Sequence, residues 1–266
     1  VLKVVPMNDK GELLYEEFLK LLTPKTKLVA CTHISNALGT INPVEQIIKD
    51  AHQVGAKVLI DACQSVPHMK VDVQKLDCDF LVFSGHKLYG PTGIGILYGK
   101  IDLLNELPPY QGGGDMIETV QFDKITYNTP PLRFEAGTPL IAEVHGLGAA
   151  IDYVNAVGLD NIHAHETALR NRLVIALEEN KRIRLIGTAK EKGAIVSFVV
   201  DKIHPLDIGT MLDLKGIAIR TGHHCAQPTM RHFNVSATDR VSFGLYNTEE
   251  EVDHFVKALH EVISLF

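Results

Sequence analysis

Two side chains suited to carbonyl chemistry, Asp61 and Lys87, each come shortly after an apolar run that predicts a buried strand, at 57–60 and 80–83. An amine held at a strand end between apolar runs is partly desolvated, which lowers its pKa and leaves it able to attack a carbonyl. Ligands of α/β sheets bind at the edge where the carboxyl ends of the strands meet. A lysine and a carboxylate at that edge are the pair that a pyridoxal phosphate site uses, for the Schiff base and for the pyridinium nitrogen.

Cys225 is a second candidate for chemistry, since it follows a predicted buried strand and has Arg220, His223 and His224 close to it in the sequence. Positively charged neighbours favour the thiolate, which is the nucleophilic form of a cysteine. Zinc binding by His223, His224 and Cys225 is the alternative that these residue types leave open. The remaining cysteines adjoin apolar runs or lie between two aspartates, and we interpret them as small packed residues: Cys31, Cys63 and Cys78.

The elements that must position these residues follow from the hydrophobic pattern. Strand and helix patterns alternate in residues 1–100, which predicts βαβ units whose strand ends meet at one edge of a mostly parallel sheet. A loop-rich passage follows at 101–138, and helical periodicity then covers 141–179 with a break near Gly158. Strands and helices alternate again after it, and the last helix begins at a capping box that starts with Thr248.

Two long segments resemble one enzyme family, in the right order along the chain. Residues 84–95, SGHKLYGPTGIG, resemble the cofactor-lysine segment of SufS-type (group II) cysteine desulfurases, and residues 220–226, RTGHHCA, resemble the catalytic-cysteine loop of that family. Residues 133–139 and 246–248 extend the resemblance over essentially the whole chain. Family members carry a long segment before the point where this chain begins, so the resemblance implies an N-terminally truncated member of the class V aminotransferase family.

The resemblance implies an α/β fold, that of the fold-type I transferases that depend on pyridoxal phosphate (PLP). Residues 1–140 then form a partial large PLP-binding domain, whose mostly parallel sheet is incomplete here. Residues 141–266 form a bridging helix and a small α/β C-terminal domain. In the family, the preceding segment supplies a phosphate cradle and a histidine that stacks on the cofactor ring. We therefore expect this chain alone to be insoluble, poor in cofactor or poorly active.

The resemblance also implies roles for several other residues. Without it, these residues would be interpreted as loop caps, turn residues, a core histidine or solvated charges. It implies that Lys87 and Cys225 are catalytic and that no metal is bound. Asn36, Arg220 and Arg240 contact the substrate, because a guanidinium fork suits a carboxylate. The implied contacts to pyridoxal 5'-phosphate are Asp61 at the ring nitrogen, Asn36 and Gln64 at the ring hydroxyl, Ser84 and His86 at the phosphate, Lys87 at the aldehyde and Thr138 at the phosphate of a neighbouring subunit.

By resemblance, the chain converts L-cysteine to L-alanine and leaves a persulfide on Cys225. The sulfur then passes to an acceptor protein of the SufE or SufU type for iron–sulfur cluster assembly, and the contact at Thr138 implies a homodimer. A selenocysteine lyase that acts on L-selenocysteine is the nearest alternative. A cofactor-free thiol hydrolase, using Cys225 with His223 or His224, and an inactive fragment that binds partners also remain open.

Composition bears on other classes of function. The 266 residues are 45% hydrophobic and 22% charged, with a net charge of −6 and no basic cluster, so neither nucleic acid nor a membrane is an expected partner. No apolar run approaches the ~20 residues of a membrane-spanning helix, and the first residues do not resemble a signal peptide. The four cysteines form no Cys-x-x-Cys pair, which fits a reducing compartment, and we expect a cytoplasmic protein.

Overall fold

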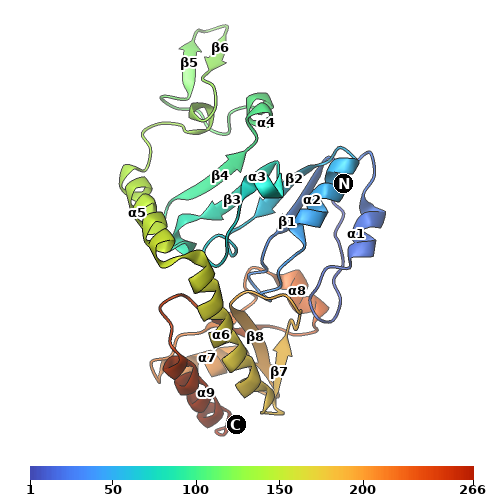
Figure 1. Cartoon of the computed structure of the whole chain (residues 1–266), viewed down its shortest axis with the longest axis vertical. Coiled ribbons are helices and arrows are strands. Elements are labelled where there is room, and N and C mark those ends of the chain that lie inside the picture. The colour runs from blue at the N-terminus through green and yellow to red at the C-terminus, as the bar shows by residue number, and fades with distance from the viewer.

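The structure, a computed structural model, describes residues 1–266 and contains two main sheets joined by a pair of long helices (Figure 1). In the N-terminal sheet the strands lie in the order β1-β2-β3-β4, with β1, β2 and β3 parallel and β4 antiparallel to β3. The mostly parallel sheet expected from the sequence is confirmed. Its strands are β1 (Leu28–Thr32), β2 (Lys57–Asp61), β3 (Phe80–Ser84) and β4 (Gly95–Gly99).

Helices α2 and α3 pack on the N-terminal sheet and connect its parallel strands. α2 links β1 to β2 and packs Val44, Ile48 and Ala51, which recur at helical spacing, against the sheet. α3 links β2 to β3, and its N-cap Asp72 accepts hydrogen bonds from backbone N–H groups of the first turn. The helices of this part are α1 (Tyr15–Leu21), α2 (Val44–Gln53) and α3 (Val73–Leu76).

Two consecutive helices, α5 (Ile141–Val157) and α6 (Leu159–Glu178), connect the two sheets (Figure 1). They meet at Gly158, whose φ of +88° interrupts the helical path, as the predicted break indicates. None of the helices combines the length and the apolar character that a membrane crossing requires.

A hairpin arm projects from the body within the passage that the sequence marks as loop-rich (Figure 1). Most of the arm is exposed, so no buried face identifies its strands, and Phe122 at its turn is fully exposed. The elements between β3 and α5, apart from β4, are the 3-10 turn η1 (Gly85–Lys87), α4 (Ile101–Glu106), β5 (Ile117–Val120), β6 (Ile125–Tyr127) and the 3-10 turn η2 (Leu132–Phe134).

The C-terminal sheet is antiparallel, with its strands in the order β7-β8-β10-β9. Helices α6, α7 and α9 pack around a core of 17 buried residues that includes Leu173, Phe198 and Leu259. The last helix begins at the predicted capping box of Thr248 and Glu251. The elements are β7 (Ile183–Ile186), β8 (Ile195–Val200), α7 (Pro205–Asp213), β9 (Arg220–Gly222), α8 (Gln227–His232), β10 (Thr238–Ser242) and α9 (Glu249–Ile263).

The loop after β1 joins the two sheets. Ser197 Oγ, in β8, donates a hydrogen bond of 2.6 Å to the carbonyl oxygen of Ala37. Gly39 has a φ of +76°, and a Cβ added to it would lie 2.9 Å from the carbonyl oxygen of Ile195, so this close approach requires glycine. The carboxyl edge of the N-terminal sheet is thereby held against the C-terminal sheet.

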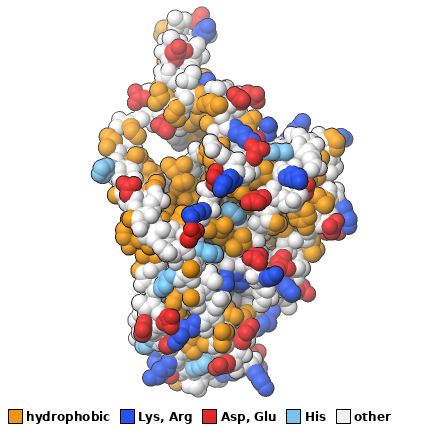
Figure 2. All heavy atoms as spheres, viewed as in Figure 1, with side chains coloured by type: hydrophobic (Ala, Val, Ile, Leu, Met, Phe, Trp, Pro, Cys, Tyr) orange, Lys and Arg blue, Asp and Glu red, His pale blue; other side chains and the backbone are white.

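Two apolar side chains are exposed on the face of the N-terminal sheet opposite α2, which is called the bare face below. Alternation and register place Leu28, Asp61 and Leu97 on this face, away from the residues that contact α2. Leu28 is 55% exposed and Leu97 is 51% exposed. In the space-filling view, hydrophobic side chains gather over β3, β4 and α5 (Figure 2).

Candidate active site

The ends of β2 and β3 bring three polar side chains together. Asp61 and Ser84 are the last residues of neighbouring parallel strands, as the sequence predicts. The backbone N–H of Cys63 donates to Asp61 Oδ1 at 2.9 Å, and its Sγ lies 3.5 Å from Ser84 Oγ. Cys63, interpreted from the sequence as a packed residue, is only partly buried and links these two side chains. Its position two residues after Asp61 was the signal that could have revealed it.

Lys87 lies in a tightly closed loop directly after β3. The N–H groups of Gly85 and Gly90 donate to the carbonyl oxygens of Ile94 and Gly85, at 2.9 and 3.1 Å. Leu88 is buried in a cluster with side chains of α5 and α6. The Lys87 side chain is partly buried and forms neither a hydrogen bond nor an ion pair within the chain. The loop backbone is therefore fixed, while the amine remains available for a ligand.

The C-terminal sheet contributes a pair of arginines. Arg220 in β9 and Arg240 in β10 are directly paired across the antiparallel strands, so their side chains share one face. Arg240 Nη1 donates to the carbonyl oxygen of Asn36 at 2.8 Å. Burial lowers the pKa of Arg240, and the charge of Arg220 acts in the same direction, while Cys225 acts against it. Two guanidinium groups and the candidate thiol therefore lie in one neighbourhood.

Asn36 connects this arginine pair with the Cys225 loop. Its side-chain Nδ2 donates a hydrogen bond of 2.7 Å to the carbonyl oxygen of His224, the residue before Cys225. Asn36 itself lies in the loop that follows β1. The loop at the carboxyl edge of the N-terminal sheet therefore contacts both the cysteine loop and the arginine strand of the C-terminal sheet.

The Cys225 loop has a strained backbone and an exposed thiol. His224 and Cys225 have φ values of +53° and +58°, in the left-handed region that costs non-glycine residues on the order of 1–3 kcal/mol each. His224 Nε2 lies 2.9 Å from Thr238 Oγ1. Burial lowers the pKa of His224 to about 4, and the charge of Arg240 contributes.

His224 is therefore neutral at pH 7, and the expectation that it favours the thiolate by positive charge is wrong. The positive charge beside Cys225 comes from Arg240. The zinc alternative gains no support, since no group of three His, Cys, Asp or Glu side chains is arranged to hold a metal ion.

Three residues predicted to contact the cofactor are not hydrogen-bonded to the other candidate site residues. Gln64 is partly buried in the loop after Asp61, and His86 is exposed beside Lys87. Thr138 is exposed in the segment that leads into α5. No hydrogen bond connects the side chains of these residues to the other candidate site residues. The structure therefore forms two groups of candidate residues. Asp61, Ser84 and Lys87 lie at or just after the ends of β2 and β3. Asn36 is hydrogen-bonded to the Cys225 loop and to Arg240.

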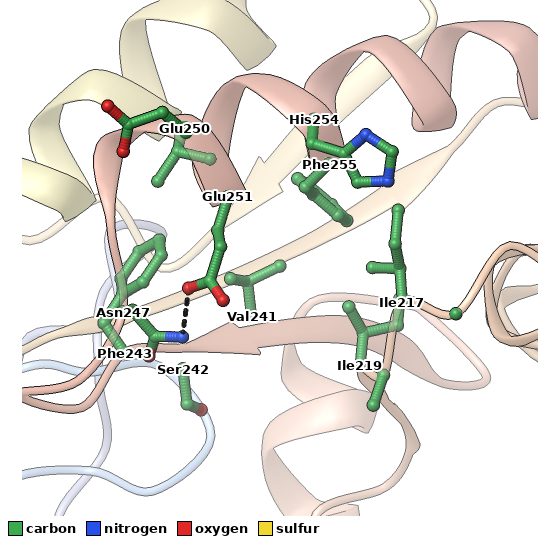
Figure 3. Close-up of a pocket in the computed structure, with 13 residues that line it drawn as sticks. Ile217, Ile219, Val241, Ser242, Phe243, Asn247, Glu250, Glu251, His254 and Phe255 are labelled. Atoms are coloured by element: carbon green, nitrogen blue, oxygen red, sulfur yellow. Dashed lines mark hydrogen bonds between the residues drawn. The ribbon is translucent and has the colours of Figure 1, made fainter.

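A cavity of about 390 Å³ lies elsewhere, between α9 and the segment before β9 (Figure 3). Ile219, Val241 and Phe255 contribute to its apolar lining, and the bonded pair Asn247 and Glu251 lies at its side. Because consecutive strand residues point to opposite faces, Val241 and the preceding arginine lie on opposite sides of the sheet. The cavity is therefore separate from the candidate site.

Residues 1–255 match the family model described as aminotransferase class-V, and the chain belongs to this family. It is 52% identical over 98% of its length to a cysteine desulfurase of Shigella sonnei, of which it covers 64%. It spans between 38% and 64% of the length of the first curated relatives that it matches. The structure resembles that of the cysteine desulfurase CsdA from Escherichia coli, with a TM-score of 0.95, 36% identity and coverage of 98% of this chain and 65% of that chain. The α/β fold is that of the fold-type I transferases.

The residues present fit PLP. The Lys87 amine has no partner within the chain, and only one oxygen of Asp61, Oδ1, accepts a hydrogen bond from the chain. Ser84 and His86, which are close to Lys87 in the sequence, offer a hydroxyl and an imidazole, which are groups that bind phosphate. A solved C-DES variant with glycine covalently linked to its PLP cofactor has a similar structure, with a TM-score of 0.80, 25% identity and coverage of 94% of this chain and 64% of that chain.

Proposed function

We propose that this chain is the part of a PLP-dependent cysteine desulfurase that carries the cofactor lysine and the sulfur-accepting cysteine. The observation that carries the proposal is the pair of bonds made by Asn36, to the His224 carbonyl and from Arg240. They join the loop of a nucleophilic cysteine to a carboxylate-binding arginine beside the strand ends that hold Asp61 and Lys87. A reaction between a thiol and an amino acid requires this combination.

Asp61, Ser84, His86 and Lys87 hold the cofactor in this proposal. Lys87 would bind the aldehyde, Asp61 Oδ2 would accept a hydrogen bond from the protonated ring nitrogen, and Ser84 and His86 would contact the phosphate. Asn36 and Gln64 reach the ring hydroxyl. When bound, the cofactor supplies an electron sink for bonds at the substrate α-carbon.

Arg220 and Arg240 bind the carboxylate of L-cysteine. The Arg220 side chain forms no hydrogen bond within the chain, while Arg240 already donates Nη1 to Asn36, so Arg220 is the more available fork. Asn36 adds a side-chain contact to the substrate. This placement leaves the substrate sulfur toward Cys225, on the loop that follows Arg220.

Cys225 then accepts the sulfur. Its thiolate attacks the substrate sulfur, a sulfur–sulfur bond forms, and the bond from the substrate Cβ to sulfur breaks. Lys87 moves the proton at the substrate α-carbon, and protonation at Cβ completes L-alanine. The balance is one L-cysteine and one thiol converted to one L-alanine and one persulfide, with no external oxidant.

The persulfide sulfur passes to an acceptor protein of the SufE or SufU type, which the exposure of Cys225 permits. A homodimer is supported by exposed apolar residues near Thr138, since Leu140, Ile141 and Val144 are 49%, 68% and 53% exposed. We place the boundary between a large and a small domain near residue 140, where α5 begins. All four cysteines are free thiols, which supports a cytoplasmic location.

The test is to incubate the purified chain with PLP and L-cysteine and to assay alanine and sulfide. Peptide mass spectrometry then locates borohydride-trapped cofactor and bound sulfur. The proposal expects cofactor on Lys87 and a persulfide on Cys225, with slow turnover and at least one alanine formed for each persulfide. Cofactor trapped only on lysines other than Lys87, or persulfide absent from Cys225 while alanine forms, would contradict it. L-selenocysteine is the matched substrate that separates sulfur from selenium preference.

A further inference from the structure

Glu166 is a buried carboxylate that the proposed reaction does not use. It lies in α6 and is 1% exposed. Its Oε2 lies 2.7 Å from Nδ1 of His68, and its Oε1 is buried with no hydrogen-bond partner. Buried carboxylate oxygens are rarely left without a donor, because desolvation without a hydrogen bond is costly. A donor for Oε1 is therefore to be sought among the surrounding side chains.

Tyr89 is the candidate donor. It follows Lys87 by two residues and has a φ of +58°. Its phenol oxygen accepts the backbone N–H of Leu245 at 3.1 Å, so its own proton must point to another acceptor. Burial raises the pKa of Tyr89 to about 12, and the charge of Glu166 adds to the increase. The phenol is therefore protonated at pH 7, and Glu166 lies close enough for its charge to act on it.

These four residues connect the segments that carry the candidate site. His68 lies in the loop that begins after Asp61, Tyr89 lies in the Lys87 loop, and Leu245 follows the strand of Arg240. Glu166 contributes from the helix between the two sheets. Apolar side chains of one cluster surround this region, among them Leu88, Leu147 and Ile162, with Val66 and Leu245 packed against them. Exclusion of water strengthens hydrogen bonds in such a setting.

We propose that Glu166 is a positioning residue that accepts a hydrogen bond from the Tyr89 phenol on Oε1 and one from His68 on Oε2, and so fixes Lys87 relative to Asp61 and to the strand of Arg240. The inference rests on the proposed function, because Lys87 is taken as the reactive amine. Glu166, Tyr89 and His68 act through the two loops, and none of them has an assigned contact with cofactor or substrate.

Tyr89→Phe separates this role from simple packing. The substitution retains the ring, whose centroid lies 6.4 Å from that of Tyr246, and removes only the hydroxyl. The Leu245 N–H and Glu166 Oε1 then both lack a partner. Glu166→Gln keeps the side-chain size but replaces the carboxylate by an amide. The amide offers only one acceptor oxygen to the Tyr89 phenol and the His68 imidazole.

The experiment uses the 266-residue chain with added PLP. The trapping rate at Lys87 by borohydride and the absorbance maximum of bound cofactor are measured for the wild type, Tyr89→Phe, Glu166→Gln and the double variant. Each single change should slow trapping about tenfold, the size of one lost buried hydrogen bond, and the double variant should be no slower than Glu166→Gln. The controls Tyr153→Phe and Glu178→Gln, at exposed positions of α5 and α6, should match the wild type.

Hydrogen exchange is the second readout and needs no cofactor. Backbone amides of residues 244–247 should exchange faster in both Tyr89→Phe and Glu166→Gln, with unchanged exchange in the core of the C-terminal sheet. Unchanged exchange and trapping in folded Tyr89→Phe, or additive effects in the double variant, would overturn the inference. Absence of trapping at Lys87 in the wild type contradicts the proposed function instead, and hydrogen exchange then decides the role of Glu166. If Glu166→Gln does not fold, the trapping rate and the hydrogen exchange of Tyr89→Phe decide the outcome.

Discussion

Cys225 owes its position to contacts made by its neighbours. The two left-handed residues, His224 and Cys225, can persist only because the surrounding structure determines them, through the Asn36 bond to the His224 carbonyl and the contact of His224 with Thr238. Arg240 places a guanidinium charge in the neighbourhood of Cys225. An exposed thiol in a fixed loop suits transfer of sulfur from one protein to another.

Cys225→Ser should leave binding of PLP and L-cysteine nearly unchanged and abolish sulfur transfer, with a loss of at least about a hundredfold, because a serine hydroxyl is scarcely ionised at pH 7 and cannot hold a persulfide. Sulfide release and cofactor absorbance measure the two properties separately. If the serine variant releases sulfide as fast as the wild type, a persulfide on Cys225 is not part of the mechanism. Selenocysteine is the control, since its weaker carbon–selenium bond can break without the nucleophile.

Lys87→Ala should abolish covalent retention of PLP after borohydride reduction, because Lys87 is the lysine held at the strand end beside Asp61. The measurement is the cofactor absorbance that remains after denaturation and dialysis. Lys124→Ala, which changes an exposed lysine of the hairpin arm, is the matched control and should retain the cofactor. Retention in Lys87→Ala, mapped to another lysine, would remove Lys87 from its role.

Asp239 is a further buried carboxyl, and it lowers stability at neutral pH. It is 0% exposed, neither of its side-chain oxygens has a partner, and burial raises its pKa to about 8. The unfolded chain releases this proton near the ordinary value of 3.8, while the folded chain keeps it until about 8. The contribution of Asp239 to stability is therefore largest below pH 3.8 and falls as the pH rises toward 8.

Asp239→Asn should consequently stabilise the chain at pH 7, by on the order of 3 kcal/mol, and should flatten the dependence of stability on pH. Urea unfolding at several values between pH 5 and 8 gives the difference between variant and wild type. Asp213→Asn, at an exposed position, is the control and should have little effect. A difference that does not grow with pH would show that Asp239 titrates near its ordinary value.

Most of the helices and strands, but not all of them, could be predicted from local sequence patterns. The strand and helix succession, the break at Gly158 and the capping box of α9 were predictable, because burial stripes and capping residues are local signals. The hairpin arm was not, since most of it is exposed. The buried strand predicted before Cys225 is limited to 220–222, where the chain pairs with β10, although Ile217 and Ile219 still pack on the core.

Gly39→Ala should disrupt the joint between the two sheets. An added Cβ meets the carbonyl oxygen of Ile195 at 2.9 Å and is strained by the positive φ, so we expect a loss of roughly 2–3 kcal/mol, which chemical unfolding measures. Gly55→Ala is the matched control, since Gly55 has a φ of +78° but nothing lies within 4 Å of an added Cβ. Its loss should be limited to about 1 kcal/mol of backbone strain. Equal losses in the two variants would show that the contact at Gly39 is unimportant.

For the whole molecule, the candidate site was only partly predictable. Asp61, Ser84 and Lys87 could be grouped because parallel strands place their ends at one edge. The bond from Asn36 to His224 and that from Leu245 to Tyr89 span 188 and 156 residues of sequence, and no local pattern encodes such contacts. The family resemblance could place Asn36 near the substrate, but it said nothing of Tyr89 and Glu166.

The bare face of the N-terminal sheet predicts how this chain behaves alone. Leu28 and Leu97 lie on this face at the two edge strands, β1 and β4, and are 55% and 51% exposed. Exposed apolar side chains beside unpaired strand edges favour association with other chains. Leu28→Thr with Leu97→Thr should therefore lower the weight-average mass of the chain, measured by sedimentation at several concentrations.

Threonine suits this test because its β-branched side chain keeps strand propensity while its hydroxyl reduces apolar surface. Leu214→Thr with Leu265→Thr is the matched control, since these leucines are 77% and 66% exposed in the C-terminal part of the chain, away from the sheet edge. It should leave the mass unchanged. A control that lowers the mass as much as the sheet variant would attribute self-association to general hydrophobicity, whereas an effect confined to Leu28 and Leu97 locates it on the bare face beside Asp61.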